Sequence, residues 1–121
     1  MSSQRGSFQP NQGKHDPVMA RMLGPGESVT SSGFGSLLVP MMKPMRGKVY
    51  VTTHRVAVVF DGGGMGPAWM VPWGDISAVN AKKNLIAATA FLTTGDDQWG
   101  VDSTKAIVRD IEAAWRIANA R

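Results

Sequence analysis

The C-terminal segment, from about Thr104 to Asn119, constrains the fold of this chain most strongly. Asp102 or Ser103 would cap a helix there, and the apolar residues that follow recur with helical spacing. They form one stripe, which consists of Ile107, Val108, Ile111, Ala114, Trp115 and Ala118. A stripe of this width needs an apolar surface to cover, so the rest of the chain has to supply that surface.

The part of the chain before this helix is typical of short strands separated by turn residues. The clearest strand is Arg55 to Phe60, in which both faces are apolar. Gly33 and Gly35 indicate a bend or bulge in the first strand, and the chain turns near Lys83-Asn84. The predicted strands are 28–39, 48–52, 55–60, 68–71, 76–82, 85–93 and 98–101. Seven closely spaced strands predict a mainly β fold, an antiparallel barrel or sandwich capped by the C-terminal helix.

The N-terminal segment has a different composition. Residues 1–15 are polar, with Phe8 as their one aromatic, which predicts a disordered tail or a peptide that orders on a partner. Asp16 as a cap, followed by Pro17, then predicts a short helix that stops at Gly24. A glycine-rich stretch at 61–67 predicts a flexible loop.

Composition limits the function classes. With 121 residues the chain has the length of one domain, and the absence of cysteine excludes disulfides, Cys-ligated zinc and a thiol nucleophile. Thirteen Lys and Arg against nine Asp and Glu give a net charge of +4, which permits contact with phosphates or an anionic membrane. No secretory signal and no bilayer-spanning apolar run is visible, so we expect a cytoplasmic location, with peripheral membrane contact left open.

Two motifs and the order of elements resemble a known superfamily. The run GKVYVTTHRV at residues 47–56 and the run VPWGDI at 71–76 resemble the motifs of GRAM and bacterial PH-like domains. Gly24-Pro-Gly-Glu27 resembles the segment that precedes their first strand, and Trp115 resembles the core Trp of their final helix. Seven antiparallel strands with one capping helix is the pleckstrin-homology (PH) layout. The resemblance covers roughly residues 23–120, and we expect one PH-like domain over 16–121.

The resemblance also implies roles for particular residues. Gly47 would let the chain enter the second strand, Tyr50 and Ile76 would pack inward, and Arg55 would begin the third strand. Domains of this kind bind phosphoinositides, peptides or protein surfaces, and some serve only as scaffolds. The fold alone does not select among these functions.

The loop between the first two strands contains most of the candidate binding residues. They are Met41, Met42, Lys43, Met45, Arg46 and Lys48. The three cations resemble the basic signature of lipid-binding PH domains, with Lys48 in place of the terminal Arg. An apolar tip beside cations suits an anionic interface, whereas a methionine-rich surface equally suits a protein partner. The methionines would otherwise fold back onto the core.

Three further residues complete the candidate set. Trp73 lies between Pro72 and Gly74, so we expect it to be the exposed tryptophan and part of a protein interface. Lys82 and Lys83 would either form a solvated turn or widen a basic patch across from Arg46 and Lys48.

No catalytic constellation is visible in the sequence. His15 and His54 have no matched acid or nucleophile, and Asp96-Asp97 lacks the ligand spacing of a calcium loop. Glycine-rich nucleotide-binding motifs are also missing, and we expect no cofactor and no metal site. Nucleic acid is disfavoured because no recognition helix or RNP motif is present.

The function we predict is therefore a non-catalytic module that binds a protein partner in an adaptor or regulatory role, with a homo-oligomer left open. Two alternatives stay open. One is peripheral binding to anionic lipid headgroups through the loop of residues 39–48. The other is a small host- or phage-encoded inhibitor of another protein.

Overall fold

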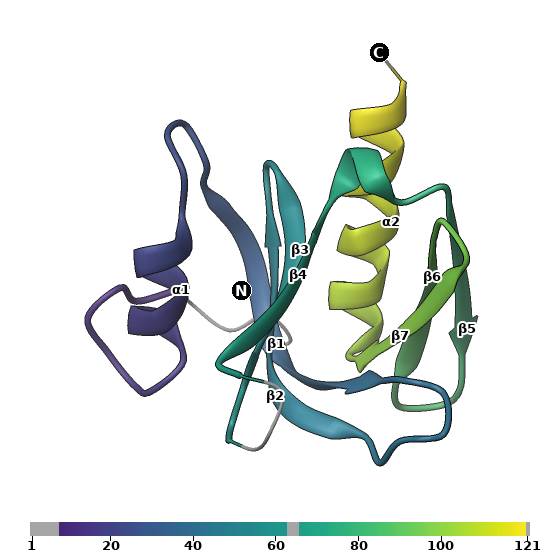
Figure 1. Ribbon diagram of the computed structural model, residues 1–121, viewed down its shortest axis with the longest axis horizontal. Coiled ribbons are helices and arrows are strands. Elements are labelled where there is room, and N and C mark those ends of the chain that lie inside the picture. The colour runs from purple at the N-terminus through teal and green to yellow at the C-terminus, as the bar shows by residue number, and fades with distance from the viewer. Residues whose placement is uncertain (1–7, 63–65, 121) are drawn as a thin grey trace.

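A computed structural model of the protein describes residues 8–62 and 66–120. Seven strands are followed by a C-terminal helix, as predicted, and a short helix precedes them (Figure 1). In chain order the elements are α1 (Asp16–Met22), β1 (Val29–Leu38), β2 (Met45–Thr52), β3 (Arg55–Phe60), β4 (Ala68–Pro72), the 3-10 turn η1 (Trp73–Asp75), β5 (Ala78–Lys83), β6 (Ala88–Thr94), β7 (Asp97–Ser103) and α2 (Lys105–Asn119).

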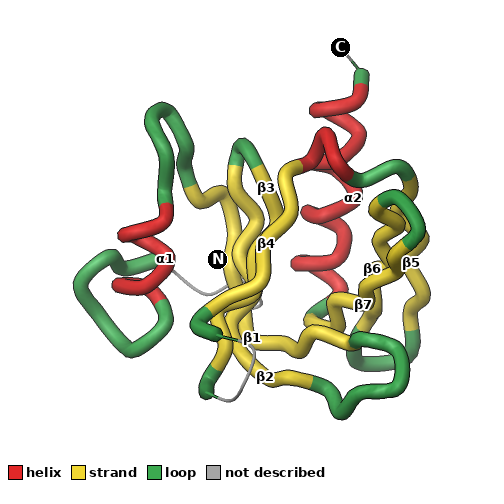
Figure 2. Tube along the Cα trace, in the orientation of Figure 1, coloured by secondary structure: helices red, strands yellow, loops and turns green. Residues whose placement is uncertain are grey.

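All seven strands belong to one antiparallel sheet with the order β4-β3-β2-β1-β7-β6-β5. β4 and β5 are its two edges, so the sheet is open and α2 lies between its two halves (Figure 2). β1 joins the halves because it pairs with β2 over most of its length and with β7 only over Ser36 to Leu38. The predicted fold class is confirmed, as an open sandwich rather than a closed barrel.

Two paired glycines allow β1 to pass from one half to the other. Gly35 and Gly47 stand opposite each other. A methyl group at Gly35 would overlap the carbonyl oxygen of Asp102, and one at Gly47 would overlap that of Val59. Glycine is required here for close backbone approach. The irregular pairing in β1 lies earlier than predicted, between Val29 and Ser31.

The inner face of the sheet forms the main core beneath α2. Ile107, Val108 and Ile111 are fully buried there, and the half-buried Trp115 donates its indole N–H to the carbonyl oxygen of Ile76 at 2.8 Å. The predicted stripe is therefore the packing face of the helix. Its cap differs from the prediction, because Thr104 rather than Asp102 or Ser103 occupies the N-cap and accepts from the N–H of Ile107.

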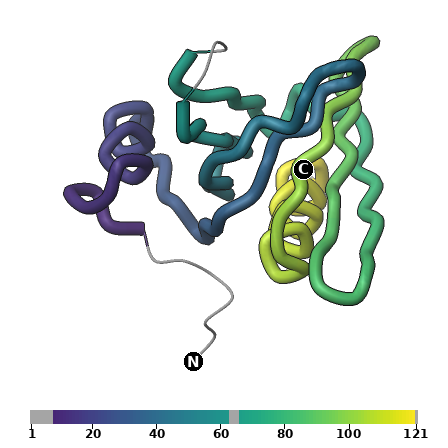
Figure 3. The backbone as a smooth tube through the Cα atoms, turned by 90° about the horizontal axis from the view of Figure 1, so that it is seen from below, coloured from purple at the N-terminus to yellow at the C-terminus, as the bar shows by residue number. Residues whose placement is uncertain are grey.

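The outer face of β1–β4 carries a second, smaller core beneath α1, and Figure 3 shows the two helices on opposite sides of the strands. Met19 and Tyr50 are fully buried there, so Tyr50 packs beneath α1 and not in the main core with Ile76. Phe8 packs edge-on against Tyr50 with ring centroids 6.0 Å apart, and His15 Nε2 lies 2.6 Å from Asp61 Oδ1.

These contacts show that packing begins before residue 16, within the segment predicted as a tail. Residues 1–7 of that predicted tail lie outside the described part of the chain, as do residues 63–65 of the predicted glycine-rich loop. The domain boundary at residue 16 stays a prediction.

Candidate functional site

The β1–β2 loop presents an apolar tip to solvent. Pro40 and Met41 occupy the central positions of a tight turn closed by a 3.1 Å hydrogen bond from Met42 N–H to the Val39 carbonyl. Met41 has a positive φ of 66° and is fully exposed, and Met42 is about half exposed. Because the turn directs these residues outward, they do not fold back onto the core. Met45, by contrast, is partly buried and packs against the core.

The three predicted cations of this loop separate into two environments. Lys43 and Arg46 are exposed, whereas Lys48 is buried with its Nζ 2.9 Å from Asp16 Oδ1. A buried, paired ammonium contributes to the packing of α1 on the sheet. The loop therefore presents two of the three cations that the resemblance to lipid-binding PH domains assigned to it.

Asp16 anchors α1 to the sheet instead of capping the helix. Its carboxylate accepts from Tyr50 Oη, Lys48 Nζ and the backbone N–H of Gln9. Burial raises the pKa of Asp16, but these hydrogen bonds outweigh burial and leave the pKa below its ordinary value. Burial, followed by the hydrogen bond to Asp16, raises the pKa of Tyr50. We interpret this cluster as a structural anchor.

A second buried ion pair holds the connection between α1 and β1. Arg55 donates two hydrogen bonds to the carboxylate of Glu27, of 2.8 and 2.7 Å, and Thr52 Oγ1 donates to the same carboxylate at 2.7 Å. The guanidinium of Arg55 is the main reason that the pKa of Glu27 falls to about 2. Hydrogen bonding to Glu27 raises the pKa of Arg55. Arg55 begins β3 as the resemblance implied, but its partner was not foreseen.

The prediction that Trp73 is exposed is wrong. Only 2% of Trp73 is exposed, because the turn η1 directs the ring beneath the end of β2, where its indole N–H donates to the carbonyl oxygen of Thr52 at 3.0 Å. Trp73 still contributes to a surface feature, since one side of its ring lines a groove.

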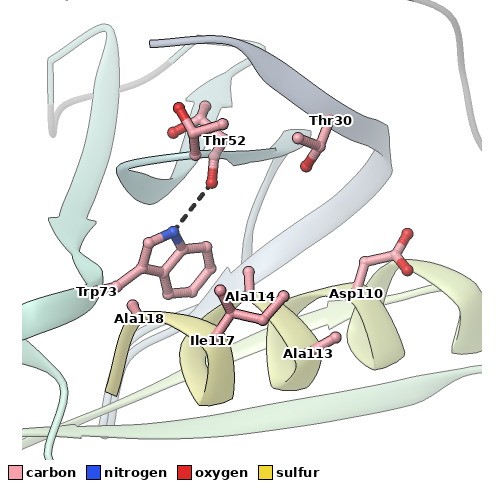
Figure 4. A pocket seen from close by; sticks show the side chains of 9 residues that line it. Thr30, Thr52, Trp73, Asp110, Ala113, Ala114, Ile117 and Ala118 are labelled. Carbon is pink, nitrogen blue, oxygen red and sulfur yellow. Dashed lines mark hydrogen bonds between the residues drawn. The ribbon is translucent and has the colours of Figure 1, made fainter. Parts of the chain in front are cut away.

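That groove has a volume of about 540 Å³ (Figure 4). It lies between α2 and the sheet end formed by the start of β1 and the end of β2. Its lining residues are Thr30, Thr52, Thr53, Trp73, Asp110, Ala113, Ala114, Ile117 and Ala118. The helical residues follow the spacing i, i+3, i+4, i+7 and i+8, so they form one small, mostly apolar face of α2. Ile117 is 63% exposed at its rim.

Lys82 and Lys83 are exposed, and they are the last two residues of β5 rather than part of a turn. Strand pairing places Arg46 and Lys82 in one row across the sheet, but β1, β7 and β6 separate them. Asp102 stands in the middle of that row, and Lys48 is engaged with Asp16. The structure therefore does not join the lysines and the β1–β2 loop into a continuous basic patch. The Nζ of Lys82 lies 5.7 Å from the centre of the Phe91 ring.

The sequence reading missed two exposed aliphatic residues beside these lysines. The strand predicted at 85–93 begins only at Ala88, and Leu85 and Ile86 stand in the β5–β6 turn, 93% and 89% exposed. Asn84 before them was the available signal, because Asn side chains close turns on the backbone that follows.

In residues 8–62 and 66–120, no three His, Asp or Glu side chains gather as metal ligands would. None of the helices in these ranges has the length and apolar character needed to cross a bilayer.

Comparison with solved structures identifies the fold. The N-terminal PH domain of Vps36 superposes with a TM-score of 0.68 at 15% sequence identity, over 82% of this chain and 86% of that one. The chain has a PH-like fold. The N-terminal PH domain of human ARAP2 matches with a TM-score of 0.50 at 18% identity, over 73% of this chain and 80% of that one.

A third match is the C-terminal domain of an unknown protein from Leishmania infantum, with a TM-score of 0.58 at 14% identity, over 82% of this chain and 89% of that one. No family model matches the chain, and none of the curated proteins does. The narrower resemblance to GRAM and bacterial PH-like domains stays a prediction. The fold by itself does not select a function.

Proposed function

We propose that this protein is a non-catalytic module that binds a short apolar segment of a partner protein in the groove between α2 and the end of β1 and β2. The observation that carries the proposal is the groove itself, with the ring of Trp73 at one wall and the small side chains of α2 at the other. Ala113 and Ala114 leave room for a partner side chain. Apolar concave sites with a few polar groups are the usual form of a ligand site.

The polar groups of the groove support binding of a peptide rather than a purely apolar molecule. Thr30 lies along it, and its hydroxyl donates to the carbonyl of Val51 at 3.0 Å, so the hydroxyl oxygen can still accept from an amide N–H of a bound main chain. The indole N–H of Trp73 donates to Thr52 and only 2% of this residue is exposed, so Trp73 closes one wall of the groove, and the exposed Ala113 and Ile117 are the side chains that meet a ligand.

The test is selection of peptides from a random library on the immobilised full chain, followed by affinity measurement. We expect the selected peptides to contain an apolar anchor and to lose about tenfold or more in affinity for Ala113→Arg, which fills the groove. The matched control is Ala78→Arg, an exposed alanine on the outer side of β5, which should bind like the unaltered chain. Peptides that bind both variants equally would contradict the proposal.

A further inference from the structure

The tip of the β5–β6 hairpin carries two adjacent branched aliphatic residues, which are the most exposed such pair in the described part of the chain. Leu85 is 93% exposed and Ile86 is 89% exposed. The hairpin projects from the end of the sheet away from η1 (Figure 1). Two neighbouring large aliphatic side chains in water are unfavourable, which indicates a surface on which they are buried.

The turn holds these two side chains outward in a fixed conformation. The side-chain oxygen of Asn84 accepts from the N–H groups of Ile86 and Ala87, at 3.0 and 2.8 Å. The N–H of Asn84 donates to the carbonyl of Ala87 at 3.0 Å. Three backbone donors of the turn, those of Asn84, Ile86 and Ala87, are therefore satisfied inside it and would not be left unpaired when the tip enters an apolar medium.

Two exposed lysines stand directly behind the apolar tip. Lys82 and Lys83 are the last residues of β5, and Asn84 alone separates them from Leu85. Lysine stems are long enough to let an ammonium stay with headgroups while residues ahead of it enter the acyl boundary. An apolar tip followed by cations is the arrangement that binds an anionic lipid surface.

From this geometry we infer that Leu85 and Ile86 insert into the interface of a membrane rich in anionic lipids, with Lys82 and Lys83 contacting the headgroups. A protein partner fits the tip less well, because a convex knob of two side chains offers far less than the roughly 800 Å² that each side of a stable interface buries. Lysine is also depleted in the cores of protein interfaces.

The insertion leaves the groove accessible. η1, which carries Trp73, precedes β5, and β5 runs from there to the tip at its other end. Ala88 beside the turn pairs with Ser103, just before α2 begins, whereas the groove follows α2 from Asp110 to Ala118. The tip and the groove thus lie toward opposite ends of the molecule, and a membrane-bound chain could hold a peptide at the same time.

Co-sedimentation of the full chain with vesicles of phosphatidylcholine alone or mixed with phosphatidylserine tests this inference. We expect binding to the anionic vesicles that weakens at high salt, and a loss of about tenfold or more in the Leu85→Glu/Ile86→Glu variant. Lys82→Glu/Lys83→Glu should also weaken binding. The matched control is Ala78→Glu/Asn80→Glu, which adds the same charge at two exposed positions toward the other end of β5 and should bind like the unaltered chain.

A second readout measures insertion directly. The chain contains no cysteine, so Ile86→Cys and Met41→Cys can each be labelled at one site with an environment-sensitive fluorophore. Anionic vesicles should shift the emission of the label at 86 to shorter wavelength and leave the label at 41 unchanged. No binding to anionic vesicles at low salt, equal binding after Leu85→Glu/Ile86→Glu, or a shift at 41 without one at 86 would each overturn the inference.

Discussion

The two helices pack on opposite faces of the same sheet by different physical means. α2 packs through a continuous apolar stripe and a hydrogen bond from Trp115 to Ile76. The shorter α1 buries Met19 over a small core and relies on the ion pairs Asp16–Lys48 and Glu27–Arg55 around it. The inner face therefore depends on packed volume, whereas the outer face depends on charges that must stay paired. The two faces should respond differently to substitution and to pH.

Removal of Arg55 from its ion pair with Glu27 should have the largest effect on stability. Arg55→Met would leave the carboxylate of Glu27, whose side chain is 1% exposed, buried without its cation. We expect the free energy of unfolding to fall by about 3–5 kcal/mol in a urea titration. The matched control is Arg116→Met, which removes an exposed partner of Glu112 at 3.6 Å and should cost less than about 0.5 kcal/mol. Equal losses would show that the outer face does not depend on its buried charge.

The inner face should lose stability when volume is removed. Ile111→Ala leaves a cavity beneath α2 where the side chain is fully buried, and should cost about 3 kcal/mol in the same titration. Ile117→Ala, on the same helix but largely exposed, should cost less than about 0.5 kcal/mol. A small effect of Ile111→Ala would mean that α2 does not close the main core.

Acid should destabilise the outer face selectively. The pKa of Glu27 is about 2 in the folded protein against an ordinary value of 4.5, so its stabilisation is complete above pH 4.5 and is lost as the pH falls toward 2. The loss from this group should reach about 2 kcal/mol near pH 3, with Asp16 acting in the same direction. Urea titrations at several pH values measure it.

Two variants separate the faces in this experiment. Ile111→Ala should retain the pH dependence of the unaltered chain, because no charge is changed on the inner face. Glu27→Gln should show a shallower loss of stability between pH 7 and pH 3, since it cannot take up the proton. If both variants kept the same slope, the acid sensitivity would have to come from other carboxylates.

Periodicity allowed the inner face to be predicted from the sequence. The stripe of α2 follows from one short segment, because burial on a single face repeats along the helix itself. β3 was recognisable as a short apolar run, and it is buried on both faces. The outer face could not be predicted in this way. Lys48 and Tyr50 alternate with the apolar Val49 and Val51, as solvent-facing residues of a strand would. The partner of Lys48, Asp16, is 32 residues earlier, so the local pattern contains no sign of the ion pair.

The candidate site was predicted less completely, for related reasons. Trp73 between Pro72 and Gly74 resembles a surface turn, but its burial depends on the carbonyl of Thr52, on another strand. Leu85 and Ile86 extend an apolar run that predicted a strand. The side-chain oxygen of Asn84 instead accepts hydrogen bonds from the N–H groups of Ile86 and Ala87, which forms a turn. The groove combines residues of β1, β2, η1 and α2, and only the folded chain brings these together.

The smallest effect on stability is expected from a change to the N-cap of α2. Thr104 caps α2 through its side-chain oxygen, which accepts from Ile107 N–H at 3.2 Å, whereas α1 has no side-chain cap and is fixed by the carboxylate of Asp16. Thr104→Ala should therefore cost about 1 kcal/mol without changing the response to pH, and Thr104→Ser should restore most of that loss. A pH-dependent loss in Thr104→Ala would mean that the start of α2 is coupled to the charges of the outer face, and the two faces would then not be independent.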